Sequence, residues 1–321
     1  MNGTDTNTPK VSVIMNCRNS AAYLKDAIDS VYAQTFKDWE IVFWDNCSMD
    51  DSAGIAKSYD YKLKYFKGDV VVPLGRARNL AIAEARGEYI AFLDCDDIWL
   101  PLKLEEQIKL FEANSAVGLV YCDTIFFKDG RDLYSVFGRE RPHRGMVFDK
   151  LLARYFLSME TVVIRRQALD GLDHWFDDEL VMAEEMDLFL RIAYRWELNF
   201  VDRPLAKWRM HDASESSKRG YLVPKEKEII IDKLIRMCPD IEIKYSAEIK
   251  EQRKMIAYEW ALSAWKDGDK RRMRRCLKPQ LFSDGKSAIA YALSMLPYAT
   301  YKRIKDSYHS LKFDSYRISK K

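Results

Sequence analysis

The segment GRARNLAIAEARGEYIAFLDCDD, residues 75–97, decides the expected fold. Apolar residues at helical spacing predict a helix over residues 76–85, and Gly87 is expected to end it in the left-handed conformation that glycine adopts at helix ends. The run YIAFLD that follows is typical of a buried strand in a parallel sheet. A helix that leads directly into a buried strand is characteristic of α/β proteins, so we expect helices and parallel strands to alternate along the chain.

The same alternation continues on both sides of this segment. Strands are expected at residues 10–16, 40–44, 63–66, 89–94 and 117–121, with two short strands around Phe200 and Trp208. Helices are expected at residues 23–31, 76–85, 102–111 and 184–194. Residues 127–144 form a polar region without a readable pattern. The predicted fold class is α/β, a mostly parallel Rossmann-like sheet flanked by helices, and such sheets bind ligands beyond the carboxyl ends of their strands.

Length and apolar spacing divide the chain into parts. With 321 residues it exceeds a single α/β domain of about 200 to 220 residues. Helical spacing of apolar residues continues from Lys225 to Asp267, which predicts a C-terminal helical extension. We therefore expect a polar N-terminal segment over residues 1–9, an α/β domain over 10–218, and a helical region over 219–321 that ends in a basic aromatic tail.

Composition argues against several classes of protein. The first residues, MNGTDTNTPK, lack the apolar core of a signal peptide, so we expect a cytoplasmic protein. The six cysteines lie far apart without a C-x-x-C pair, which argues against a zinc site and a disulfide framework. No apolar run reaches the about 18 residues that a membrane span needs. A net charge of +3 is nearly neutral for this length, and we expect no nucleic acid among the partners.

Three carboxylates occupy four consecutive positions at the end of the strand YIAFLD. These are Asp94, Asp96 and Asp97, and like charges this close together destabilise a fold unless a cation offsets them. A hard divalent ion with oxygen ligands, Mn²⁺ or Mg²⁺, suits such a cluster. It would bridge a substrate diphosphate and stabilise the charge that grows on the leaving phosphate oxygen. The alternative is a turn whose Asp side chains cap the next helix.

Over residues 9–215 the chain resembles glycosyltransferase family two, the large group with the GT-A fold. Three segments carry the first part of the resemblance: the opening strand that ends at Asn16, Arg18 and Asn19, the acidic turn WDNCSMDDS at 44–52, and the Arg-Asn pair before the acids in residues 75–97. The family usually has two acids in the acidic turn. Here Asn46 takes the second position, so Asp45 alone would contact the nucleotide base. Residues 10–218 would then be a GT-A catalytic domain.

The resemblance implies a role for each matching residue. Asp96 and Asp97 would hold the metal, and Asp94 would contact the ribose or the sugar. Arg78 would contact the donor, and an Arg near a helix N-terminus is also well placed for a phosphate because guanidinium and backbone N–H groups both donate to anions. The alternative for Arg78 is a solvated helix charge. The donor-binding residues would be Asn16, Arg18, Asp45, Arg78, Asn79, Asp94 and Glu184.

Two further segments, AEEMDLFLRIA at 183–193 and KWRMHDASES at 207–216, are also similar to the family. Glu185 stands where the catalytic Asp of the family usually falls, one methylene longer, and would take the proton of the acceptor hydroxyl as general base. Glu184 beside it would contact the donor. Apart from the resemblance, acids in a first helical turn are ordinary partners of the helix dipole. His211 would complete a Mn²⁺ shell, and the alternative for a lone histidine is a structural role.

The tail from Ser287 to Lys321 interleaves aromatic and aliphatic residues with Lys and Arg. Two interpretations stay open. It could form an amphipathic helix on the anionic inner face of the cytoplasmic membrane, which would make the protein peripheral. It could equally be a docking helix whose Tyr residues pack on the domain.

The function that these features predict is inverting, metal-dependent glycosyl transfer. The donor would be a nucleotide-diphosphate sugar, with UDP as the favoured nucleotide, and the acceptor a hydroxyl of a glycan or lipid-linked acceptor in surface polysaccharide or glycoconjugate synthesis. The alternative is a non-catalytic nucleotide-sugar-binding or assembly module, motivated by Asn46 and Glu185. An NAD-dependent oxidoreductase is disfavoured because no G-x-G-x-x-G follows the first strand. The donor sugar, the acceptor and the oligomeric state stay open.

Overall fold

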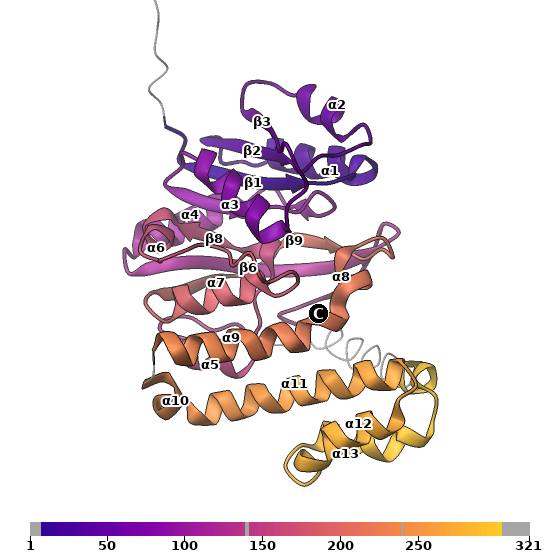
Figure 1. Ribbon diagram of the computed structural model, residues 1–321. Helices are drawn as coiled ribbons and strands as arrows, with labels where there is room; N and C mark the ends of the chain where they lie inside the picture. The colour runs from indigo at the N-terminus through magenta and orange to yellow at the C-terminus, as the bar shows by residue number, and fades with distance from the viewer. Residues whose placement is uncertain (1–7, 139–140, 239, 304–321) are drawn as a thin grey trace, which may run out of the picture. The chain divides into compact units, whose positions relative to one another are not determined.

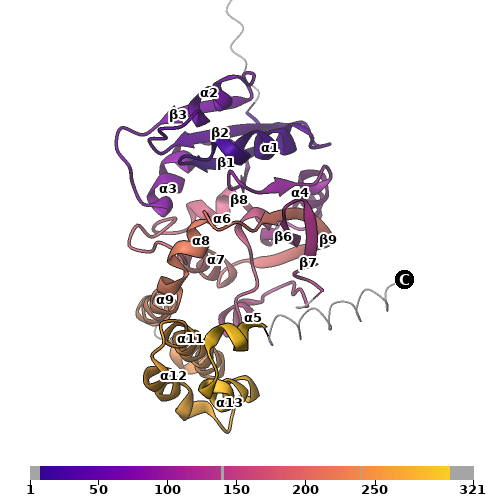
Figure 2. The same ribbon diagram turned by 90° about the vertical axis from the view of Figure 1, so that its right-hand side faces the viewer.

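The computed structural model describes residues 8–138, 141–238 and 240–303 (Figures 1 and 2). Contacts within the chain divide it into two compact units. The first unit comprises Met1–Leu151 with Tyr155–Ser214, and the second comprises Leu152–Arg154 with Glu215–Lys321. Strands are confined to the first unit in the described residues, and the second unit is helical.

The first unit is built on one sheet, which has nine strands in the described residues. The path through the sheet is β3-β2-β1-β4-β8-β6-β9-β5, and β7 pairs with β6 outside this path. The strands are β1 (Val11–Cys17), β2 (Trp39–Asp45), β3 (Leu63–Lys67), β4 (Tyr89–Phe92), β5 (Ile98–Trp99), β6 (Val117–Lys128), β7 (Arg131–Ser135), β8 (Val163–Arg165) and β9 (Glu197–Arg209). The pairs β1–β2, β1–β4, β2–β3 and β6–β9 are parallel, which confirms the predicted fold class.

Helices pack on both faces of this sheet. The helices of the first unit are α1 (Ala21–Tyr32), α2 (Ser52–Lys57), α3 (Leu74–Glu84), α4 (Lys103–Ala113), α6 (Arg166–Asp170) and α7 (Glu184–Ala193), and α5 (Phe148–Ala153) begins in this unit and ends in the second. In β1, Val11, Val13 and Met15 join one core with residues of α1 and α4. Because side chains alternate along a strand, Ser12 and Ile14 face the opposite side, where α3 contacts β1 and β2.

Two predicted elements differ from the structure because they depend on pairing between distant strands. The region 127–144, expected to be without pattern, begins with a hairpin: β6 runs on to Lys128 and turns through Asp129 and Gly130 into β7. Both turn residues have positive φ, 49° and 75°, as hairpin turns that match strand twist require. The two short strands expected around Phe200 and Trp208 are one strand, β9, whose pairing with β6 shifts register near Pro204. Proline is tolerated at such irregularities because a ladder hydrogen bond is already missing there.

Gly87 does not adopt the predicted left-handed conformation. Helix α3 ends at Glu84, the following Ala85 is extended with φ −75° and ψ 140°, and Gly87 is not among the positive-φ glycines of the described chain. Glycine is needed here for a different reason. A Cβ at position 87 would lie 2.5 Å from the backbone nitrogen of Ser12, and the Gly87 N–H donates to Ser12 Oγ at 2.8 Å. The residue therefore lets the chain entering β4 approach β1 closely.

Replacing Gly87 with alanine is expected to lower the free energy of unfolding by about 1–3 kcal/mol, the usual cost of overpacking. The backbone of β1 is the obstacle, so no side-chain rotation relieves the clash. Gly171→Ala is a matched control in the same unit, because a Cβ there meets only the Gln167 carbonyl oxygen at 3.4 Å. Urea unfolding followed by tryptophan fluorescence measures both variants. Equal urea midpoints for Gly87→Ala and Gly171→Ala would show that the close approach of residue 87 to β1 does not require glycine.

The second unit is the helical extension that the sequence predicts. Its helices are α8 (Glu215–Arg219), α9 (Val223–Met237), α10 (Asp240–Lys244), α11 (Ser246–Lys266), α12 (Lys270–Leu277) and α13 (Gly285–Ala292), with short 3₁₀ turns η3 (Lys278–Gln280) and η4 (Leu293–Met295). Trp265, Met273 and Leu277 lie in its core. None of the described helices has the length and apolarity to cross a membrane. Residues 304–321, which make up half of the predicted basic aromatic tail, lie outside the described residues.

Candidate active site

Two polar turns follow β2 and β4, the strands on either side of β1, at one edge of the sheet. Asn46, after β2, donates its backbone N–H to the Cys17 carbonyl oxygen at the end of β1. Leu93, after β4, does the same to the carbonyl oxygen of Ile14 in β1. The turn with Asp45 and the turn with Asp94 are therefore both fastened to β1, at the edge where parallel sheets bind ligands.

The first of these turns is held together by its own side chains. Asp45 is buried, and its carboxylate accepts from the Ser48 N–H at 2.7 Å and from the Tyr65 hydroxyl at 2.6 Å. Asn46 donates from Nδ2 to the Val72 carbonyl oxygen at 2.8 Å and accepts from the Val72 N–H at 3.0 Å. An amide can donate and accept at once, which a carboxylate cannot. The Asn at this position therefore fastens the segment that leads into α3.

Three residues at the end of β1 and just after it differ in their exposure and hydrogen-bond partners. Asn19 has a left-handed backbone, φ 55°, and its side chain accepts from the Met49 N–H at 2.8 Å, so it shapes the turn. Arg18 is exposed. The Nδ2 atom of Asn16 is buried and makes no hydrogen bond to the protein. A buried donor without a partner is costly, so Asn16 is the residue here that gains most from a ligand.

Arg78 of α3 lies at the centre of the acidic residues. It is 3% exposed, which excludes the alternative of a solvated helix charge. Its guanidinium donates to Glu184 Oε1 at 2.6 Å and to Asp94 Oδ1 at 3.0 Å. The neighbouring Asn79 pairs with both backbone groups of Phe176, at 2.9 and 3.0 Å. Arg78 therefore joins α3, the end of β4 and the first turn of α7.

Replacing Arg78 with methionine is expected to lower the free energy of unfolding by about 3–5 kcal/mol, because Asp94 and Glu184 would lose the charge that compensates them. Arg76→Met on the exposed side of the same helix is the matched control and should change stability little. The double variant Arg78→Met with Glu184→Gln should recover part of the loss. Thermal and urea unfolding measure all three variants. An Arg78→Met protein as stable as the control would contradict the buried ion pair.

The three acids of the predicted metal cluster lie in different surroundings. The side chains of Asp94 and Asp96 are 36% and 31% exposed, and Asp96 Oδ2 lies 2.8 Å from His211 Nε2. Asp97 is 1% exposed and accepts from the backbone N–H of Arg209 at 2.8 Å. Burial and the charge of Glu160 raise the pKa of Asp97 well above its usual range. Asp96 and His211 thus meet at the surface, whereas Asp97 points inward.

The Asp96–His211 pair fits a divalent cation that takes its other ligands from a substrate. In the part of the chain that the structure describes, no group of three or more His, Cys, Asp or Glu side chains is arranged to hold a metal ion. Mg²⁺ and similar ions are commonly held by one or two protein ligands together with substrate phosphates. Partial burial and the charge of Asp94 raise the pKa of Asp96, and a cation would favour its carboxylate. The donor set therefore suits a metal–diphosphate complex.

Arg209 holds the end of β9 against the acidic turn, and the sequence did not single it out. Its Nε atom donates to the Asp96 carbonyl oxygen at 2.7 Å, and its guanidinium lies 4.6 Å from the centre of the Tyr23 ring. The Tyr23 ring in turn lies 4.9 Å from the imidazole of His211. In the sequence, Arg209 was marked only by its position two residues before His211.

Glu185 lies in the first turn of α7, next to Glu184. Burial and the Glu184 charge raise the pKa of Glu185 to about 8, against the opposing effect of Arg78. The buried hydroxyl of Tyr155 is a neighbour of this carboxyl group, and burial together with the Glu185 charge raises the pKa of Tyr155. A carboxyl group with a pKa close to the working pH is suited to general acid–base catalysis. Tyr155 and Glu160 belong to these surroundings, and no motif marked them.

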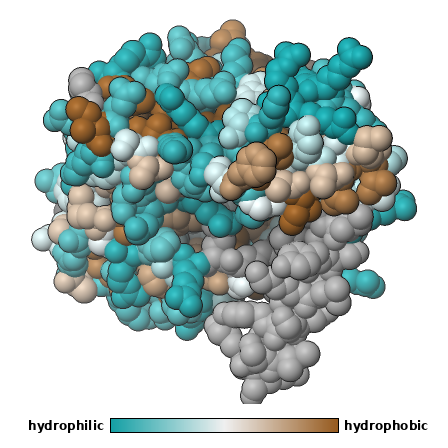
Figure 3. Space-filling model, turned by 90° about the horizontal axis from the view of Figure 1, so that it is seen from below, coloured by the Kyte–Doolittle hydropathy of each residue, from teal (hydrophilic) through white to brown (hydrophobic). Residues whose placement is uncertain are grey.

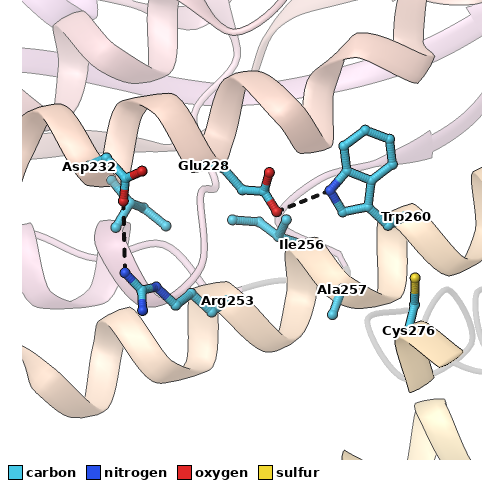
Figure 4. Close-up of a pocket in the computed structure, with 8 residues that line it drawn as sticks. Glu228, Asp232, Arg253, Ile256, Ala257, Trp260 and Cys276 are labelled. Atoms are coloured by element: carbon cyan, nitrogen blue, oxygen red, sulfur yellow. Dashed lines mark hydrogen bonds and ion pairs between the residues drawn. The ribbon is translucent and has the colours of Figure 1, made fainter. Parts of the chain in front are cut away.

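The helical unit contains a pocket of its own, of about 430 Å³ (Figure 4). It is lined by Glu228, Ile231, Asp232, Arg253, Ile256, Ala257, Trp260 and Cys276. Its polar groups pair with each other: Arg253 with Asp232 at 3.8 Å, and Trp260 Nε1 with Glu228 at 3.1 Å. We assign this pocket no part in the chemistry.

Comparison with known proteins gives consistent results. The family model described as glycosyl transferase family 2 matches residues 12–172. An uncharacterized glycosyltransferase of Methanocaldococcus jannaschii is 30% identical over 208 residues, which cover 63% of this chain and 71% of that protein. The UDP-Glc:alpha-D-GlcNAc-diphosphoundecaprenol beta-1,3-glucosyltransferase WfgD of Escherichia coli is 27% identical over 225 residues, which cover 69% of this chain and 85% of that protein.

Solved structures show the same fold at lower identity. S. aureus TarS 1–349 in complex with UDP-GlcNAc superposes with a TM-score of 0.60 at 20% identity, covering 97% of this chain and 92% of that chain. The mannosyltransferase PcManGT from Pyrobaculum calidifontis, in complex with GDP-Man and Mn²⁺, superposes with a TM-score of 0.62 at 18% identity, covering 98% and 87%. These similarities identify the sheet and its helices as a GT-A fold.

Proposed function

The chain belongs to glycosyl transferase family 2, and from this premise we propose that it is an inverting, metal-dependent enzyme that transfers sugar from a UDP-sugar. The coarser description, a transferase that uses nucleotide-sugar donors, follows from membership of the family. One observation carries the finer proposal. Arg78 ties Asp94, at the proposed donor site, to the first turn of the helix that bears Glu185. Asp94 and the helical turn that bears the proposed base are therefore joined through one buried arginine.

Asp96 and His211 are the residues that would hold a divalent ion. When bound, Mn²⁺ or Mg²⁺ would stabilise the negative charge that develops on the leaving diphosphate. Asp97 is left out of this ligand set because its carboxyl group is buried against Arg209. Its part is to fix the turn that presents Asp96.

The remaining residues bind the donor and move one proton. Asn16 and Asp45 are proposed to contact the nucleoside, and Asp94, whose side chain is 36% exposed, is proposed to contact the ribose or the sugar. The acceptor oxygen attacks the anomeric carbon while its proton passes to the Glu185 carboxylate. The bond from that carbon to the diphosphate oxygen breaks, and the nucleoside diphosphate leaves with the electron pair. A single displacement of this kind inverts the configuration at the anomeric carbon.

The proposed acceptor is a hydroxyl of a glycan or a lipid-linked sugar, in surface polysaccharide or glycoconjugate synthesis. The E. coli relative is named for transfer from UDP-Glc to a diphosphoundecaprenol-linked GlcNAc. The solved structures were obtained with different donors, UDP-GlcNAc and GDP-Man. UDP is proposed because the E. coli relative, at 27% identity, is named for a UDP-sugar donor, whereas the protein in complex with GDP-Man is only 18% identical.

A thermal-shift screen of nucleotide sugars with and without Mn²⁺ tests the proposal, because a bound ligand raises the unfolding midpoint according to its affinity. UDP-sugars with Mn²⁺ are expected to give the largest shifts. A larger shift with GDP-mannose would overturn the assignment of UDP. Equal shifts without the metal would overturn the metal site. A protein that binds UDP but cleaves no UDP-sugar, with or without acceptor extracts, would be a binding module rather than an enzyme.

The raised pKa of Glu185 predicts how activity depends on pH. The group must be ionised to accept a proton, and its pKa is about 8. Transfer measured as kcat/KM should therefore rise by about tenfold per pH unit below that value and level off above it. Initial rates between about pH 6 and 9 measure the profile. A profile that is flat through this range would show that Glu185 is not the titrating base.

A further inference from the structure

Positive charge is concentrated in the last described part of the helical unit. Residues 270–303 contain nine Lys or Arg and one acid, a net charge of +8, whereas the whole chain carries +3. The cations are Lys270, Arg271, Arg272, Arg274, Arg275, Lys278, Lys286, Lys302 and Arg303. The one acid, Asp284, caps α13 by accepting from the Ser287 N–H at 2.9 Å. This segment is therefore the basic part of a chain whose remainder is net negative.

Large apolar side chains lie in the same segment and face solvent. Phe282, between η3 and α13, is fully exposed, and Ile289 and Met295 are 60% and 72% exposed. Several large apolar side chains exposed within one short segment often mark an interaction site. In Figure 3, brown hydrophobic residues lie among teal hydrophilic ones on the face nearest the viewer.

Hydrogen bonds join the basic helix α12 and the turn before α13 to the segments that carry the exposed apolar side chains. Lys270 Nζ donates to the Met295 carbonyl oxygen at 2.8 Å, and Arg274 Nε donates to Ser294 Oγ at 2.7 Å. Two of the five cations of α12, Lys270 and Arg274, therefore lie beside Ser294 and the exposed Met295. Gln280 donates to Ser287 Oγ at 2.8 Å, which fastens the turn that carries Phe282 to α13. Within the unit, α12 and α13 lie next to each other (Figures 1 and 2).

We propose that this basic apolar surface, residues 270–295, docks on an anionic lipid bilayer. Phe282, Ile289 and Met295 would enter the interface, and the cations of α12 would face lipid phosphates. Nucleic acid is the other polyanion to consider, but aliphatic side chains such as Ile289 and Met295 do not stack on bases as aromatic rings do. Docking would bring the enzyme to a lipid-linked acceptor, a consequence that rests on the proposed function.

Cosedimentation of the full chain with vesicles tests the proposal. Vesicles of phosphatidylcholine and phosphatidylglycerol in equal parts should bind the protein, and vesicles of phosphatidylcholine alone should bind it weakly. Binding should weaken as salt is added, because salt screens the lipid charge. The double variant Phe282→Ser with Met295→Ser should lower partitioning by roughly tenfold or more. Arg271→Glu with Arg275→Glu should remove the preference for anionic vesicles.

Ile243→Ser provides the matched control, because Ile243 is 82% exposed in the same unit but lies outside the basic segment. It should bind vesicles like the native chain. Equal binding by the Phe282 and Met295 variant, or no preference for anionic lipid, would overturn the proposal. The proposal would also be overturned if single-stranded RNA displaced the native chain from vesicles and the Phe282 and Met295 variant bound that RNA as strongly as the native chain does. Nucleotide-induced thermal shifts are measured on every variant, so loss of docking is distinguished from failure of the proposed function.

Discussion

Replacing Glu185 with glutamine is expected to lower kcat for sugar transfer by roughly 10²–10⁴-fold, the range that a general base contributes. Glutamine keeps the shape of the side chain but cannot accept the acceptor proton. Because Glu185 lies beside the Glu184 charge, the substitution adds no buried charge, and the variant should be at least as stable as the native chain. Nucleotide binding should also be kept. Steady-state kinetics and thermal unfolding together separate loss of chemistry from loss of structure.

Two further variants make this prediction specific. Glu179→Gln removes an exposed acid from the segment before α7 and should leave kcat unchanged. Glu185→Asp keeps a carboxylate but withdraws it by one methylene, so it should retain more activity than Glu185→Gln. If Glu185→Gln transferred sugar at the native rate, another residue would have to accept the proton.

Replacing Asp96 with asparagine is expected to weaken Mn²⁺-dependent nucleotide binding by roughly 100-fold or more, since even second-sphere changes cost 10–100-fold at metal sites. Asp96 is the partly exposed acid that meets His211 at 2.8 Å. His211→Ala should act in the same direction. Isothermal titration with UDP, with and without Mn²⁺, measures the effect, and the metal-free affinity should change little.

Asp97→Asn is the informative comparison, because both residues are acids of the same turn. The Oδ1 atom of an asparagine at position 97 can still accept from the Arg209 N–H, which Asp97 accepts at 2.8 Å. Mn²⁺-dependent binding should therefore be largely kept in this variant. Equal losses in the two variants would show that Asp97 also holds the metal, and that the inward orientation is not the one used when the donor binds.

Local pattern was enough to predict much of this protein. The parallel strands are short apolar runs, and three Asp residues directly after one of them marked the ligand-binding edge of the sheet without any knowledge of pairing. The α/β class and the helical extension followed from such runs and from helical spacing, and the GT-A fold was expected from the resemblance of the motifs to the family. By contrast, the hairpin of β6 and β7 and the single long β9 depend on which strands pair, which no local pattern records.

The burial and the hydrogen-bond partners of individual site residues were less predictable. Arg78 and Glu184 are 106 positions apart, so nothing near Arg78 indicates that it is buried in an ion pair. Asn46 could be seen to depart from the family, but its reciprocal bonds to Val72 arise only when the following segment folds back. Tyr155 and Glu160 carry no motif, and Arg209 was marked only by its place two residues before His211. They become part of the site because distant segments pack around the acidic turn.

Incubation of the purified chain with a UDP-sugar and Mn²⁺, followed by ¹H NMR, tests whether the chain transfers sugar with metal dependence and inversion. The donor found by the thermal-shift screen would be used, with an acceptor extract if hydrolysis is slow. Metal-dependent release of UDP, with the transferred or hydrolysed sugar appearing first in the anomeric configuration opposite to that of the donor, is the predicted result. Retention of the donor configuration, or cleavage that is unchanged by chelation of the metal, would contradict it.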